Sequence, residues 1–270
     1  VYKRQTLIGT KGVGLTSGYL YPGATYPYGM VQFTPSYFSK RSGFVINQLS
    51  GGGCEHMGNF PTFPVKGKLK MSPDNILNYR INISEEKGHA GYYEAMVQED
   101  IKAKLTVTER TGMASYEYPA DQQYGTVIIG GGISATPIEQ AAIVITAPNK
   151  CEGYAEGGNF CGLRTPYKVY FVAEFDTDAL ESGTWKRNEL KPNTTFAEGE
   201  YSGVYFTFDV NKKKNIQYKI GVSYVSVENA RENLKAENTG WDFLQIQNQA
   251  ESKWNHYLGM IEVEGTNPDR

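Results

Sequence analysis

Short segments in which apolar and polar residues alternate constrain the fold of this chain more than any other feature. A period of two is that of a β-strand with one buried face. Spaced about ten residues apart, such segments are typical of antiparallel sandwiches and barrels. The segments are KGKLKMS (66–72), LNYRINIS (77–84), GYYEAMVQ (91–98), IKAKLTVTE (101–109) and MASYEYP (113–119). Further strands are predicted at Thr126–Ile129, Ala141–Thr146, Tyr167–Glu174, Gly203–Val210 and Gln217–Val225.

The composition also indicates a mostly β protein with many turns. The 270 residues include 20 Tyr, 12 Phe, 30 Gly and 12 Pro. Aromatic residues favour strands, whereas Gly and Pro favour turns. We therefore predict an antiparallel β-sandwich over residues 6–226. A formal net charge of -2 argues against a nucleic-acid partner. No apolar run is long enough to predict a membrane span.

The two ends of the chain depart from this pattern. Residues 1–5 (VYKRQ) resemble a translated sequencing-adapter end, and the fold prediction leaves them out. Residues 227–262 predict a helical linker, because apolar side chains recur there at steps of three and four. These side chains are Ala250, Trp254, Leu258 and Ile261. Residues 263–270 (VEGTNPDR) are expected to be the truncated start of a further domain.

The segment Ser50–Gly67, SGGGCEHMGNFPTFPVKG, is the strongest candidate for a functional loop. Consecutive glycines cost conformational entropy and suit a backbone that turns tightly or approaches another surface. Loops mounted on a rigid scaffold often carry binding residues. Glu55 is the one acidic residue of the loop, and His56 follows it. The structural alternative is a crowded strand crossing that needs glycine.

Patterns that would support catalysis or metal binding are weak. The three histidines, His56, His89 and His256, lack the spacing of a metal-ligand set. Glycoside hydrolysis needs two carboxyl groups on opposite sides of the bond, and nothing pairs Glu55 with a second one. Glu109 lies beside Arg110, which favours an ion pair. We therefore expect neither catalytic residues nor a metal site in this chain.

The three cysteines leave the redox state open. Cys151 and Cys161 flank a glycine-rich connection and could close a small disulfide loop in an oxidising compartment. Cys54 would then be left over, either as a thiol that faces a ligand or as an inert buried residue.

Several stretches along nearly the whole chain match the motifs of one enzyme family in the right order. LIGT (7–10) and PGATYPYGMVQFTP (22–35) are similar to an opening that commonly reads FIGT and then PGA and PFGMVQ. LSGGGCEHMGNFPTFPVKG (49–67) is similar to an LSGxGC segment. The other matches are HAGYYEAMVQEDIKAKLTVTERTGMASYEYP (89–119), GGNFCG (157–162), YKVYFVAEFD (167–176) and SYVSVENARENLKAE (223–237). Together they resemble the N-terminal domain of glycoside hydrolase family 92, the calcium-dependent exo-α-mannosidases.

The resemblance implies a mutarotase-like β-sandwich, or supersandwich, packed against a C-terminal (α/α)6 barrel. Enzymes of the family release mannose from glycans with inversion, using a general acid, a general base and a calcium ion. The resemblance places these groups mainly in the barrel, which this chain lacks, and implies a secreted or periplasmic protein. The N-terminal domain contributes loops to the mannose pocket between the domains. The residues that carry over to this role are Gly53, Cys54, Glu55, His56 and Asn59.

The chain departs from the family pattern near this loop. Gln48 stands where the family has His, Asn59 often replaces Asp, and Glu55–His56 replaces the commoner Ser-Asp pair. One alternative is a stand-alone carbohydrate-binding module, with exposed Tyr and Trp side chains on one sheet face. Another is a self-sufficient mutarotase-like enzyme that uses His56 and Glu55. The truncated-enzyme hypothesis instead predicts an exposed apolar patch around the glycine loop and the terminal helices.

Overall fold

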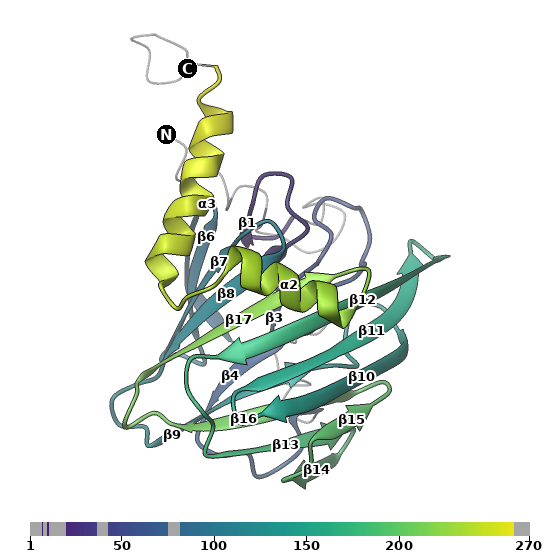
Figure 1. Cartoon of the computed structure of the whole chain (residues 1–270), viewed down its shortest axis with the longest axis vertical. Coiled ribbons are helices and arrows are strands. Elements are labelled where there is room, and N and C mark those ends of the chain that lie inside the picture. Colours follow the sequence, from purple (N-terminus) through teal and green to yellow (C-terminus); the bar gives the residue numbers. More distant parts are fainter. Residues whose placement is uncertain (1–6, 8–9, 11–19, 37–42, 75–81, 262–270) are drawn as a thin grey trace.

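The chain forms a two-layer sandwich of antiparallel β-sheets with two helices at its C-terminal end (Figure 1). The computed structural model describes residues 7, 10, 20–36, 43–74 and 82–261. The predictions for residues 1–5 and 263–270 therefore lie outside the described residues. The predicted fold class, a mostly β antiparallel sandwich followed by helices, is confirmed.

Every strand pairing within the two sheets is antiparallel. The first sheet has the order β1 (Ala24–Thr25), β2 (Gln32–Pro35), β3 (Phe44–Val45), β4 (Thr62–Lys66), β9 (Tyr124–Gly130), β16 (Ser202–Asp209), β13 (Glu181–Lys186) and β14 (Glu189–Pro192). The second has the order β15 (Phe196–Glu198), β10 (Ile138–Ala147), β11 (Lys150–Phe160), β12 (Leu163–Phe175), β17 (Asn215–Ser223), β8 (Thr111–Glu117), β7 (Ile101–Val107), β6 (Tyr92–Val97) and β5 (Ile83–His89).

The core lies between the facing surfaces of the two sheets. Alternate residues of β6 are buried, as the period of two requires. Phe175 of β12 crosses the layer, with its ring centroid 5.0 Å from those of Phe206 and Phe208 in β16. Each such aromatic side chain contributes about 1.5–3 kcal/mol by its burial. Apolar contact between the sheets therefore holds the sandwich together.

One predicted strand is displaced, and another lies mostly outside the described residues. The segment 66–72 was expected to be a strand, but β4 ends at Lys66, and Gly67 follows with a φ of 74°. A positive φ breaks the extended backbone that a strand needs. Most of the segment 77–84 lies outside the described residues, and β5 begins at Ile83.

The glycine-rich connection between Cys151 and Cys161 is not a loop. It forms most of β11, which pairs with β10 from Lys150 to Gly157 and with β12 from Lys150 to Phe160. A Cβ at Gly153 would lie 2.1 Å from the carbonyl oxygen of Ala142, so the close approach of β10 requires glycine there. The glycines of this segment thus serve strand packing rather than a turn.

Helix α2 (Val227–Glu237) lies across the outer face of β17 and β12 (Figure 1). Ser226 caps its first turn by accepting a hydrogen bond from the backbone amide of Asn229. Ala230 and Leu234 are its buried residues, and they pack over Gly221. A Cβ at Gly221 would lie 2.5 Å from the carbonyl oxygen of Ala230.

Helix α3 (Phe243–Leu258) runs along the end of the nine-stranded sheet near β6, β7 and β8. Of the predicted apolar face, Ala250 is fully buried and Trp254 is half-buried. Ile261 lies beyond the last helical residue and is 79% exposed. In the described part of the chain, no helix has the length and apolar character that crossing a bilayer requires.

We expect Gly91→Ala to loosen α3 from the sheet. Gly91 has a φ of 76°, and a Cβ there would lie 2.6 Å from the Cβ of Ala250. The clash and the strained φ together destabilise this contact by about 1–3 kcal/mol. Hydrogen exchange of the α3 amides should therefore become at least several-fold faster. Gly67→Ala is the matched control, because Gly67 has a similar φ of 74° but nothing within 4 Å of its Cβ position. Equal exchange in the two variants would contradict the contact.

Candidate functional site

The glycine-rich loop connects β3 to β4 and turns several times within a few residues. Gly51, Gly53 and Gly58 have φ values of 75°, 77° and 76°. These are left-handed conformations, which side chains with a Cβ adopt at a cost. Gly53 is exposed, and nothing lies within 4 Å of its Cβ position. Position 53 therefore needs glycine because of its left-handed backbone conformation, not because of a crowded strand crossing.

A disulfide bond ties this loop to the sandwich, and it differs from the Cys151–Cys161 pair that the sequence left possible. Cys54 is bonded to Cys161, which lies in the turn between β11 and β12. Cys151 is a free thiol, fully buried in the core. The possible Cys151–Cys161 pair is wrong, because Cys151 lies at the start of the long strand β11 and Cys161 follows its far end. Cys54 is accordingly neither a leftover residue nor a free thiol facing a ligand.

Asn59 is fully buried at the base of the loop and holds it by hydrogen bonds. Its backbone amide donates to Asn47 Oδ1 at 2.7 Å, and its own Oδ1 accepts from Asn47 Nδ2 at 3.0 Å. The Tyr167 hydroxyl donates to the same Asn59 oxygen at 2.9 Å. Burial raises the pKa of Tyr167 to about 12, although hydrogen bonds to Asn59 and Ser134 lower it. The phenol thus stays protonated and remains a donor.

His56 packs against the tip of the β11–β12 hairpin. Its Nδ1 lies 3.2 Å from the carbonyl oxygen of Asn159, and its ring meets those of Phe160 and Tyr167 edge to face. His56 is 7% exposed, whereas Glu55 is half-buried. The structure therefore brings His56 and Asn59 together around Tyr167, in an arrangement that supports the loop.

No group of three or more His, Cys, Asp or Glu side chains in the described residues is arranged to hold a metal ion. A calcium site needs six to eight oxygen ligands, several of them from carboxylates. The described residues therefore offer no cluster of three or more acidic side chains that could form the charged part of a calcium site.

A cavity of about 480 Å³ lies where the glycine loop meets residues 25–32 and Trp254 of α3. Its walls include Tyr26, Met30, Gln48, Leu49, Tyr224 and Trp254. Trp254 Nε1 donates a hydrogen bond to the carbonyl oxygen of Thr25 at 2.6 Å, which fixes the indole ring. The volume falls in the range of small-molecule sites. Gln48 departs from the family pattern and is not among the site residues that the sequence predicts.

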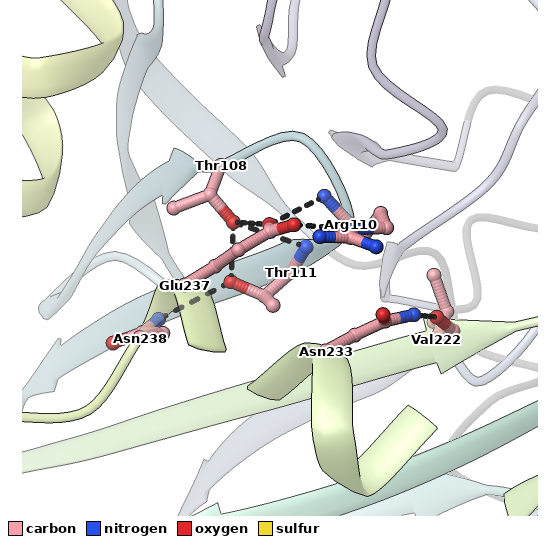
Figure 2. Close-up of polar contacts among 7 residues, drawn as sticks. All are labelled: Thr108, Arg110, Thr111, Val222, Asn233, Glu237 and Asn238. Atoms are coloured by element: carbon pink, nitrogen blue, oxygen red, sulfur yellow. Dashed lines mark hydrogen bonds and ion pairs between the residues drawn. The ribbon is translucent and has the colours of Figure 1, made fainter. Parts of the chain in front are cut away.

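The part of the cavity wall formed by Met30 is held by a hydrogen bond to the turn between β7 and β8. The Met30 amide donates to the carbonyl oxygen of Glu109 at 2.7 Å. Glu237, at the end of α2, holds this turn by hydrogen bonds and an ion pair (Figure 2). Glu237 Oε2 accepts hydrogen bonds from Thr108 Oγ1 at 2.6 Å and from the Arg110 amide at 2.8 Å, and Oε1 pairs with the Arg110 side chain. Arg110 is thus paired with Glu237 rather than with Glu109.

Apolar side chains are exposed around the mouth of this cavity. Leu49 is 42% exposed, Met30 39% and Tyr224 38%, and all three line the cavity. Val225 follows Tyr224 and is 71% exposed. Isolated apolar residues are normal on a surface, but grouped ones mark a contact or ligand site.

The fold defines this chain as an antiparallel β-sandwich domain that presents a rigid glycine loop beside a small cavity. Residues 5–223 match the glycosyl hydrolase family 92 N-terminal domain, and residues 229–270 match the glycosyl hydrolase family 92 catalytic domain. The chain belongs to glycosyl hydrolase family 92.

Similar proteins agree with this assignment. An uncharacterized secreted glycosidase of Arthroderma benhamiae is 25% identical over 296 residues, which cover 95% of this chain and 38% of that protein. Among solved structures, the family 92 glycosyl hydrolase ccman5 superposes with a TM-score of 0.85 at 21% identity, covering 97% of this chain and 37% of that one. The inverting mannosidase BT2199 of Bacteroides thetaiotaomicron superposes with a TM-score of 0.81 at 24% identity, over 97% and 36%. The chain thus spans little more than a third of these relatives.

Proposed function

We propose that this chain is the N-terminal β-sandwich domain of a secreted, exo-acting α-mannosidase. In the full-length protein it supplies loops to a mannose pocket at the interface with a catalytic barrel. The barrel carries the general acid, the general base and most ligands of a calcium ion, and hydrolysis inverts the anomeric centre. Residues 6–226 form the sandwich in this proposal, residues 227–262 lead toward the barrel, and residues 263–270 begin it.

The observation that carries this proposal is the anchoring of the glycine loop. The Cys54–Cys161 bond, the Asn47–Asn59–Tyr167 hydrogen bonds and the packing of His56 all hold it in place. A rigidly held loop with an exposed glycine, Gly53, suits close approach of a substrate hydroxyl to the backbone. We propose that Gly53 and Glu55 face the mannose pocket, while Cys54, His56 and Asn59 border it and hold its shape.

Three further observations support the proposal. The exposed apolar residues Met30, Leu49 and Tyr224, which line the cavity, form a surface that a second domain would cover. A solved relative at 23% identity, the α-mannosidase BT3965 of Bacteroides thetaiotaomicron, is described as a complex with mannoimidazole. The curated relative is described as secreted, which supports export of this protein.

The alternative, a stand-alone carbohydrate-binding module, has less support from the sheet surface. Tyr154 and Tyr170 are neighbours on the outer face of β11 and β12. The Lys168 ammonium lies 4.1 Å from the centre of the Tyr154 ring and 5.7 Å from that of Tyr170. These rings are therefore engaged with a cation of the same chain rather than free as a sugar platform.

The proposal predicts activity only when the catalytic domain is present. The natural reading frame is recovered and expressed with its catalytic domain, and both this longer chain and residues 1–270 are incubated with methyl α-D-mannopyranoside. Proton NMR should show β-mannose as the first product of the longer chain, and chelation of calcium should abolish its release. Residues 1–270 should release no mannose, and methyl α-D-glucopyranoside is the substrate control. Mannose release by residues 1–270, or α-mannose as the first product, would contradict the proposal.

A further inference from the structure

The turn between β14 and β15 carries the triplet Asn193–Thr194–Thr195. Asparagine followed two residues later by Ser or Thr, with no proline between them, is the acceptor sequence for N-linked glycans. A triplet this short also occurs by chance, so its place in the fold decides whether it can carry a glycan. Because a glycan is bulky and polar, a usable asparagine must lie on the surface.

The structure presents this triplet to solvent. All three residues are exposed. Asn193 has a φ of 58°, a left-handed conformation that asparagine tolerates in turns. Its backbone amide donates to the carbonyl oxygen of Ser182 at 3.0 Å, and Thr194 Oγ1 donates to the carbonyl oxygen of Lys191 at 2.8 Å. These bonds hold the turn without the Asn193 side chain or the Thr195 hydroxyl, the two groups that define an acceptor.

The sequence contains one other such triplet, Asn82–Ile83–Ser84. Asn82 and Ser84 are exposed too, but Ser84 lies within β5, where it pairs with Met96 of β6. The triplet at Asn193 lies wholly between two strands. Asn193 is therefore the stronger acceptor candidate.

The turn at Asn193 also joins the terminal strands of the two sheets. β14 ends the eight-stranded sheet, β15 ends the nine-stranded sheet, and both lie at the end of the sandwich away from α3 (Figure 1). Terminal strands offer unpaired backbone groups to other chains, and proteins commonly cover or charge such edges. Phe196, the first residue of β15, is 55% exposed beside this turn. A glycan on Asn193 would cover an apolar sheet edge.

The redox chemistry of the chain fits the compartment in which N-linked glycans are added. The disulfide between Cys54 and Cys161 belongs to an oxidising compartment, such as the lumen of the endoplasmic reticulum. The similar glycosidase of Arthroderma benhamiae is described as secreted. Both observations are consistent with passage of this chain through a secretory pathway.

We propose that Asn193 is an N-glycosylation acceptor and that its glycan covers the edges of β14 and β15. This inference rests on the proposed export of the chain and not on its mannosidase activity. An oligosaccharyltransferase of the secretory pathway carries out the transfer, with a lipid pyrophosphate-linked oligosaccharide as the donor. A bond forms between Asn193 Nδ2 and the anomeric carbon of the first sugar. The bond from that carbon to the pyrophosphate oxygen breaks, Nδ2 loses a proton, and the lipid pyrophosphate leaves.

The test is expression of the chain behind a secretory signal peptide in insect cells. The chain is purified from the medium and from the microsomal fraction, so that retained molecules are analysed as well. Peptide N-glycosidase F in ¹⁸O-labelled water converts a glycosylated asparagine to labelled aspartate, and mass spectrometry of peptides then reads Asn193 and Asn82 separately. Asn193 should be labelled, and Thr195→Ala should reduce its labelling about tenfold or more, because the acceptor triplet is lost. Thr195→Ser is the matched control and should keep the label, since it keeps the hydroxyl.

The covering role of the glycan has its own measurement. Purified Thr195→Ala should aggregate at least several-fold faster than Thr195→Ser on gentle heating, as measured by light scattering. Adding Phe196→Thr to Thr195→Ala should remove most of this difference, because the exposed apolar side chain is gone. A structural role of residue 195 alone would leave the effect of Phe196→Thr the same in both backgrounds.

Two results would overturn the inference. Unlabelled Asn193 in both fractions, with a secreted glycoprotein of the host labelled as positive control, would show that Asn193 is not an acceptor. Equal aggregation of Thr195→Ala and Thr195→Ser would show that the glycan does not protect the sheet edges. Neither result touches the proposed function, which fails separately if the longer chain releases no mannose, whether or not Asn193 carries a glycan.

Discussion

Replacing both Cys54 and Cys161 by alanine should lower the free energy of unfolding by about 3–5 kcal/mol. The disulfide joins residues separated by 107 positions, so it restricts a large part of the unfolded chain. It also holds the glycine loop against the β11–β12 hairpin. Urea denaturation of the unsubstituted and the doubly substituted chain measures the difference, with unfolding followed by far-UV circular dichroism.

Chemical reduction supplies the control for this prediction. A reducing agent should destabilise the unsubstituted chain by a similar amount and leave the double variant unchanged. Cys151→Ser should keep its sensitivity to reduction, because Cys151 is a free, buried thiol. Peptide mapping without reduction should recover a Cys54–Cys161 cross-link. A Cys151–Cys161 cross-link, or no effect of reduction, would contradict the pairing.

Glu237→Ala should lower the free energy of unfolding by about 2–3 kcal/mol. The substitution leaves Thr108 Oγ1 and the Arg110 amide without their acceptor, as Figure 2 makes visible. The Arg110 side chain is 41% exposed, so its ion pair adds little. A negative charge at the end of a helix is unfavourable by about 0.3–1 kcal/mol, and its removal offsets part of the loss.

Glu232→Ala is the matched control for Glu237, since it makes the same change at an exposed position of α2. It should alter stability by less than about 0.5 kcal/mol. Hydrogen exchange of the Met30 amide should accelerate in Glu237→Ala only, because Met30 donates to the turn that Glu237 holds. Similar stabilities for the two variants would show that the Glu237 contacts contribute nothing.

The alternation of apolar and polar residues was sufficient to predict the sandwich. In β6 and β7, inward side chains such as Tyr93 and Leu105 are fully buried, while their sequence neighbours face outward. The same rule missed β11, because its glycines carry no side chain to mark a face and are normally typical of turns. Glycine is needed at position 153 because β10 approaches it closely, and this contact appears only once the strands are paired.

The candidate site could be predicted only as a segment. Glycines in sequence identify a loop, but the partner of Cys54 is 107 positions away, and no local pattern selects it. Glu237 and Arg110 are 127 positions apart and meet because α2 crosses the sheet. The isolation of the Gln48 amide is likewise a property of packing, since burial without a partner exists only in the folded chain.

The position of β17 in the nine-stranded sheet determines when that sheet can be completed during translation. β5 to β8 form one meander and β10 to β12 another, and β17 lies between β8 and β12. The two halves share no edge until β17 has left the ribosome and been inserted. Contacts between residues so distant in sequence form slowly. Before β17 is added, the two halves of this sheet expose the edges of β8 and β12, which β17 alone covers in the described structure. The nascent chain is most open to mispairing of strands during this interval.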